Sequence, residues 1–149
     1  MDGEGYIGTV ACTHKGVSRV QFQAKIEVAQ TRSTPLLQLE RLFGGHVRVY
    51  QNTHGAVFTW YLYGAKAMAA LEQMRPYLVL KREQADLVIE FQTTKFSNRR
   101  GNPNGQVSDG VFAHRTELHD RLKQLNARNV RHAERLSESA PQAALRMVR

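Results

Sequence analysis

The chain has 149 residues, of which 42% are hydrophobic, so it is long enough for about one domain with a full core. Its 21 Lys and Arg outnumber 13 Asp and Glu, giving a net charge of +8 and an isoelectric point near 10.1. This balance favours a polyanionic partner, most often nucleic acid, with simple solubility as the alternative.

The single cysteine, Cys12, excludes an internal disulfide framework and suits a reducing compartment. No apolar run approaches the roughly 18 residues that a membrane span needs. The acidic start is unlike a secretory signal peptide. We therefore expect a cytoplasmic protein (bacterial, phage-host or organellar interior) with no contact with a membrane.

Two pairs of strands are predicted in the first half of the chain. Residues 18–29 alternate apolar and polar side chains, a period of two that buries one face of a strand. Residues 6–14 precede them, and Lys15-Gly16 supplies the turn of a hairpin. A second pair, residues 46–51 and 57–62, is joined by a stretch rich in turn-forming residues.

Three helices are predicted around these strands. Residues of about 33–43 form the first, with Pro35 in its first turn and Gly44-Gly45 as its stop. Gly64 begins the second, and Pro76 breaks it and begins a third, with Leu80 among its apolar positions. Residues 1–94 thus form an α+β unit, a four-stranded antiparallel sheet with helices on one face and a polar, basic face opposite.

Composition changes after residue 94. Residues 97–110 are rich in Gly, Asn, Arg and Ser and indicate a loop, and residues 112–126 indicate one helix. Residues 127–149 contain several arginines and few large apolar groups, which is typical of a partly disordered tail. We therefore expect residues 95–149 to form a basic, partly flexible C-terminal extension of the unit.

Four local motifs occur in an order that resembles one unit of the LAGLIDADG homing-endonuclease family. The resemblance covers residues 1–94, and the ten-residue motif that begins at Pro76 is the most specific. The motifs are Asp2-Gly3-Glu4-Gly5, Val28-Ala29-Gln30, Leu42-Phe43-Gly44-Gly45-His46-Val47 and Pro76-Tyr77-Leu78-Val79-Leu80-Lys81-Arg82-Glu83-Gln84-Ala85.

The resemblance implies a subunit of a site-specific double-strand DNA endonuclease from an intron or mobile element. It would hydrolyse phosphodiesters with Mg²⁺ and act as a homodimer on a long, near-palindromic site. Only the C-terminal tip of the family's namesake helix is present, so the start is misplaced, the chain is truncated or the copy has decayed. We expect a homodimer if that helix is restored. The alternatives are a non-cleaving, maturase- or regulator-like DNA- or RNA-binding protein, and a decayed remnant.

The resemblance also assigns catalytic roles. Glu4 matches the metal-binding acid, and the carbonyl of Gly3 is the expected second Mg²⁺ ligand. Lys81 matches the basic residue near the scissile phosphate, Gln30 the residue that orients water, and Arg32 a further basic partner. The alternatives are a frayed acidic terminus for Glu4, an exposed helix lysine for Lys81 and a solvent-facing strand end for Gln30.

The polar face of the predicted sheet is the candidate DNA-reading surface, because Gln, Arg, Lys and Glu can each hydrogen-bond to base edges in the major groove. A merely solvated sheet face is the alternative. The candidate reading residues are Gln21, Gln23, Lys25, Glu27, Arg48, Tyr50, Thr59 and Tyr61. Arg99 and Arg100, with Arg121, Lys123, Arg128 and Arg131 further on, are candidates for phosphate contacts.

Overall fold

The structure is a computed structural model that describes residues 5–13, 20–53, 55–99 and 107–139. Its sheet contains β1 (Gly5–Cys12), β2 (Gln21–Gln30), β3 (His46–Asn52) and β4 (Gly55–Tyr63). All neighbouring strands are antiparallel, in the order β1-β2-β4-β3. The predicted α+β architecture and four-stranded antiparallel sheet are confirmed.

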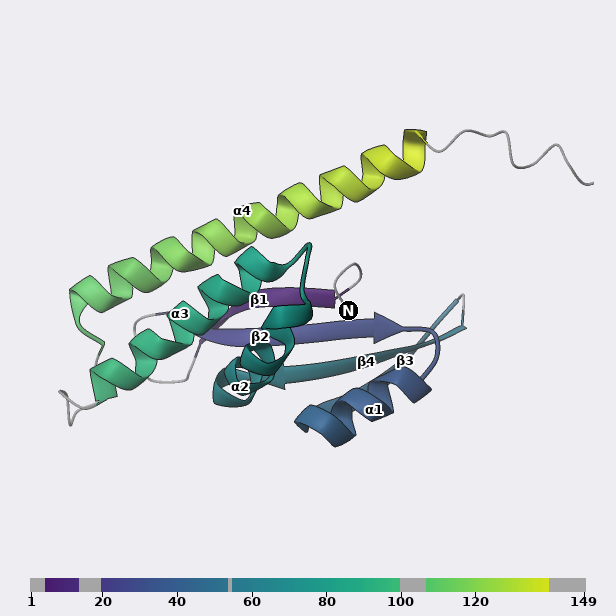
Figure 1. The fold of residues 1–149 in the computed structure, drawn as a ribbon, viewed down its shortest axis with the longest axis horizontal. Helices are drawn as coiled ribbons and strands as arrows, with labels where there is room; N and C mark the ends of the chain where they lie inside the picture. Colours follow the sequence, from purple (N-terminus) through teal and green to yellow (C-terminus); the bar gives the residue numbers. More distant parts are fainter. Residues whose placement is uncertain (1–4, 14–19, 54, 100–106, 140–149) are drawn as a thin grey trace, which may run out of the picture.

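The helices pack on one side of this sheet. Helix α1 (Thr34–Phe43) contacts β3 and β4, and helix α2 (Gly64–Met74) contacts β2 and β4. Helix α3 (Arg82–Arg99) contacts β1 and β2. The long helix α4 (Asp109–Ser139) runs beside α3 and along β1, the edge strand of the sheet (Figure 1). The other side of the sheet remains uncovered by these helices.

The core lies between the sheet and the helices. Ile26 of β2, Trp60 of β4 and Phe91 of α3 are fully buried, and each such side chain stabilises the fold by roughly 1.5–3 kcal/mol. The Trp60 indole donates a hydrogen bond of 2.8 Å to the carbonyl of Gly44. Gly45 follows at φ +93°, where an added Cβ would lie 2.6 Å from the Tyr61 carbonyl oxygen. The end of α1 is thereby fastened to β4.

The prediction that Pro76 begins a helix is wrong. Pro76 lies in a short 3₁₀ helix (η1, Arg75–Tyr77), Leu78 is extended, and α3 begins only at Arg82. Leu78 is buried in the core, whereas Leu80 is 69% exposed. Residues 79–81 form a bend and turn between Leu78 and α3, and this turn places Lys81 in the interior.

Helices α3 and α4 are both longer than predicted. Helix α3 continues to Arg99, within the expected loop, and α4 continues to Ser139, within the expected tail; residues 100–106 and 140–149 lie outside the described residues. Leu118 and Leu122 of α4 join the core of the sheet unit. The division into residues 1–94 and 95–149 stays a prediction.

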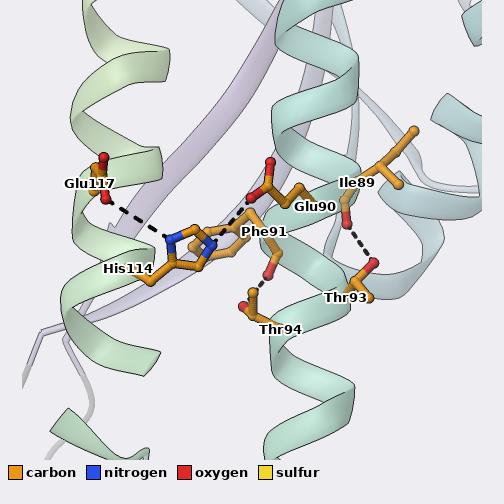
Figure 2. Close-up of polar contacts among 7 residues, drawn as sticks. All are labelled: Ile89, Glu90, Phe91, Thr93, Thr94, His114 and Glu117. Carbon is orange, nitrogen blue, oxygen red and sulfur yellow. Dashed lines mark hydrogen bonds and ion pairs between the residues drawn. The ribbon is translucent and has the colours of Figure 1, made fainter. Parts of the chain in front are cut away.

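Polar contacts fasten α4 to its neighbours. His114 Nε2 lies 3.2 Å from a carboxylate oxygen of Glu90 on α3, and Figure 2 shows this pair between the two helices. Arg115 is buried, donates a 3.0 Å hydrogen bond to the carbonyl of Phe22 on β2, and stacks over the Phe91 ring at 4.2 Å. In the part of the chain that the structure describes, no helix is long and apolar enough to cross a membrane.

Candidate nucleic-acid interface and catalytic end

The uncovered side of the sheet collects the polar residues that the sequence predicted there. Paired residues of antiparallel strands share a face, and alternate residues along each strand do so too. The register pairs Glu27 with Tyr61 and Arg48 with Thr59. The side chains of these pairs lie on the side of the sheet opposite to the buried side chains of Val28 and Trp60. We call this surface the reading face. It carries all eight candidates: Gln21, Gln23, Lys25, Glu27, Arg48, Tyr50, Thr59 and Tyr61.

Aromatic rings hold the cations of the reading face in place. The Arg48 guanidinium lies 5.0 Å from the centre of the Tyr61 ring, and its hydrogen bond to Tyr50 raises the pKa of Arg48 further above its usual value. Lys25 Nζ lies 5.8 Å from the centre of the Tyr63 ring. Such contacts stabilise a cation by roughly 0.5–1 kcal/mol at an exposed site.

Lys25 also forms an ion pair with Glu27 on the same strand. Partial burial acts to lower the pKa of Lys25, but the hydrogen bond and attraction of Glu27 outweigh it, so the pKa lies above its usual value. Lys25 is therefore cationic at neutral pH. Thr59, in contrast, is buried on this face, with 8% of its surface exposed.

The reading face also carries polar residues that were not predicted from the sequence, among them Tyr63, His46 and Asn52. Tyr63 pairs with Lys25, His46 pairs with Tyr61, and Asn52 pairs with Gly55 at the far end of the sheet. Tyr63 was missed because the predicted strand stopped at residue 62, one residue early. The same alternation that identified Arg48 and Tyr50 would have identified His46 and Asn52.

The start of β1 lies beside two of the predicted catalytic residues. Lys81 is buried, with 8% of its surface exposed, and its Nζ donates a hydrogen bond to the Gly5 carbonyl. The reading of Lys81 as an exposed helix lysine is therefore wrong. Gly5 pairs with Val28, two residues before Gln30, the last residue of β2. Lys81, Gly5 and Gln30 thus share one end of the sheet, where β1 begins and β2 ends (Figure 1).

The other site candidates are placed only in part. Glu4, Gly3 and Arg100 lie outside the described residues, although Glu4 directly precedes Gly5 in the chain. Arg32 is exposed in the link between β2 and α1, two residues beyond Gln30. Arg99 is the last residue of α3 rather than part of a loop. Among the described residues, no three His, Cys, Asp or Glu side chains gather in a way that could hold a metal ion.

Solved structures share this architecture. The homing endonuclease I-CvuI, in complex with the I-CreI target, matches with a TM-score of 0.66 at 25% identity, over 83% of this chain and 75% of that one. The homing endonuclease I-TnaI matches at 0.60 and 15% identity, over 86% and 91%. The LAGLIDADG homing endonuclease I-GzeII, in complex with its DNA target, matches at 0.62 and 14% identity, over 79% and 40%.

No protein-family model and no curated protein matches the sequence. The shared fold, the 25% identity with I-CvuI and the local motifs together indicate a relationship to these proteins. Among the described residues of 5–94, the strands and helices follow the order expected from those motifs, except that the helix expected at Pro76 begins at Arg82. The chain has the fold of the LAGLIDADG homing endonucleases, the family that its sequence motifs resemble.

Proposed function

We propose that this protein binds double-stranded DNA through its reading face and is a subunit of a site-specific, metal-dependent DNA endonuclease. The observation that carries the proposal is the convergence of two features. One face of the sheet presents base-reading side chains, and one end of that sheet holds Lys81 beside the residue that follows Glu4.

The reading face has the chemistry of direct readout. Arg48 can bond both acceptors of guanine, and Gln21 and Gln23 can bond adenine in the same bidentate manner. A two-stranded or larger antiparallel ribbon fits the major groove. Homing endonucleases of the same fold have been solved with DNA targets, which supports this assignment.

The catalytic end supplies a cation and hydrogen-bonding groups. We assign Lys81 to the scissile phosphate, where it would offset negative charge that develops on the phosphate oxygens. Gln30 would orient the attacking water. Arg32 follows Gln30 by two residues at the same end of the sheet and would add positive charge.

Glu4 and the Gly3 carbonyl are the proposed ligands of a divalent cation. Both are hard oxygen donors, which Mg²⁺ prefers, and the Gly5 contact fixes the chain directly after them. A bound Mg²⁺ would supply an activated water and charge stabilisation at the scissile phosphate. The I-CvuI structures were determined in the presence of Mg and of Ca, which supports a divalent cation.

A cut through both strands would need a second unit, because one unit offers one metal-binding acid. The exposed apolar side chains Tyr77, Val79 and Leu80 lie next to buried Lys81 and support association near the catalytic end. A homodimer, formed when the namesake helix is restored, is the assembly we propose.

The test is selection of a target from a randomised duplex library with Ca²⁺, followed by cleavage of that target with Mg²⁺. We expect one selected sequence and, in a chain that carries the restored namesake helix, cleavage that Glu4→Gln abolishes while binding is retained. Selection without cleavage would support the non-cleaving DNA-binding alternative. Selection of no duplex sequence would contradict the proposal.

A further inference from the structure

A half-open cavity of about 270 Å³ lies between β1 and α4. Its volume is far above the roughly 10–15 Å³ that a single water requires. Five side chains with polar tips line it, two from β1 and three from α4. They are Tyr6, Thr9, His119, Lys123 and Asn126.

Gly8 makes the walls of this cavity possible. A Cβ at Gly8 would lie 2.6 Å from the Tyr6 hydroxyl oxygen and 3.1 Å from Asn126 Nδ2. Because Gly8 has no Cβ, the Tyr6 side chain can lie along the strand, where its hydroxyl donates a 3.1 Å hydrogen bond to the Thr9 carbonyl. Asn126 donates a 3.1 Å bond to the Ile7 carbonyl. Both walls are therefore held by the backbone of the edge strand.

His119 lines the cavity, and two contacts orient its ring. Its Nδ1 lies 2.7 Å from the Thr9 hydroxyl oxygen, and its ring stacks on Phe22 with 4.4 Å between centroids. Thr9 engages Nδ1, which leaves Nε2 as the second ring nitrogen; Nε2 donates to a ligand in the tautomer in which the Thr9 hydroxyl donates to Nδ1. Asn126 retains a second N–H after its bond to Ile7, and Lys123 adds an ammonium group on an exposed position of α4.

The charge of this lining favours an anion. Lys123 is cationic, and none of the described residues that line the cavity carries a carboxylate. Burial lowers the pKa of His119 below its usual value; Asp120, its acidic neighbour on α4, acts to raise this pKa, and Lys123 acts to lower it. A tetrahedral phosphate accepts hydrogen bonds from lysine, amide and imidazole donors at once.

The cavity borders the reading face. Tyr6 pairs with Glu27, so its side chain belongs to the same side of the sheet as Lys25 and Tyr61. Lys123 and Asn126 approach from α4 across the outer edge of β1. A duplex that lies on the reading face would carry its backbone past this edge.

We propose that the cavity between β1 and α4 is a phosphate site that holds one backbone phosphate of the bound duplex. The part of this inference that names a DNA duplex as the source of the phosphate rests on the proposed function. The chemistry of the site itself, a phosphate group held by Lys123, Asn126 and His119, does not depend on it.

The experiment compares Lys123→Gln with Lys66→Gln, an exposed lysine on α2, away from the reading face. Duplex affinity is measured from about 50 to 200 mM salt, where each lost phosphate contact lowers the slope of log K against log salt by about 0.9. In parallel, inorganic phosphate and a nucleoside monophosphate are titrated while NMR follows the His119 ring nitrogens.

A slope lowered by about 0.9 in Lys123→Gln only, with weak binding of the free phosphates, is the expected result. A response of His119 to micromolar phosphate or nucleotide with an unchanged slope would support the phosphate site but overturn the duplex as its source. Equal slope changes in both variants, or no His119 response and no slope change, would overturn the site. If no duplex binds, the proposed function fails, and the phosphate titration still decides the site.

Discussion

Lys81 and Gly5 are 76 positions apart in the sequence and are joined by a hydrogen bond from Nζ to the carbonyl. The bond fastens the turn before α3 to the start of β1. It also brings a buried ammonium group next to the residue that follows Glu4. The hydrogen bond from Lys81 to Gly5 would therefore have two roles. It would position the charge of Lys81, and it holds the turn before α3 against β1.

We predict that Lys81→Met lowers cleavage of the selected target by roughly a hundredfold or more, the scale of losing one charge-stabilising group. The variant also leaves the Gly5 carbonyl without this donor, which costs about 1–3 kcal/mol of folding free energy. Single-turnover cleavage and urea unfolding measure the two effects. Lys66→Met is the control and should alter neither; full cleavage by Lys81→Met would contradict the assignment.

Base preference should depend on Arg48. Arg48→Ala should relax the preference at one position of the target and cost about 1–3 kcal/mol against the preferred base. Arg99→Ala, at the end of α3, should weaken all sequences about equally. Binding of a panel of single-base variants of the target checks both expectations. An unchanged profile in Arg48→Ala would show that this side chain does not contact a base.

The stability of the fold should fall in mild acid because of His119. Burial lowers the pKa of His119 below its usual 6.5, with Lys123 acting in the same direction and Asp120 opposing them. As pH decreases through about 6.5, the unfolded chain takes up the proton first and is stabilised, so the free energy of unfolding decreases.

Urea unfolding at two pH values on either side of this range measures the effect. His119→Gln should reduce the difference between the two pH values. His114→Gln is the control, because His114 is exposed between Glu90 and Glu117 rather than packed against Phe22. An identical pH dependence in His119→Gln and the unmodified protein would show that His119 does not cause the acid sensitivity.

Gly45 should tolerate no side chain. Gly45→Ala places a Cβ 2.6 Å from the Tyr61 carbonyl at φ +93°, so we expect a loss of roughly 1–3 kcal/mol. Gly110→Ala is the matched control, because the space around Gly110 in α4 is open. Gly110→Ala should instead stabilise the helix by up to about 1 kcal/mol. Equal stability of the two variants would contradict this account of the turn between α1 and β3.

Local periodicity accounts for the parts of the fold that the sequence could predict. The alternation around Lys25 gave both the strand β2 and the faces of its side chains. The parts of the fold that could not be predicted from the sequence depend on contacts between residues that are distant in the chain. The turn that buries Lys81 depends on Gly5, and the position of α4 depends on Arg115 meeting Phe22 and on His119 meeting Thr9. No local pattern encodes such partners.

The central claim is that the reading face binds duplex DNA, and amide NMR shifts on addition of the selected duplex test it most directly. We expect the largest changes at Gln23, Lys25 and Tyr61 on the sheet, with Leu37 of α1 and Lys66 of α2 unchanged. Changes confined to α1 and α2, with the sheet residues unaffected, would contradict the claim.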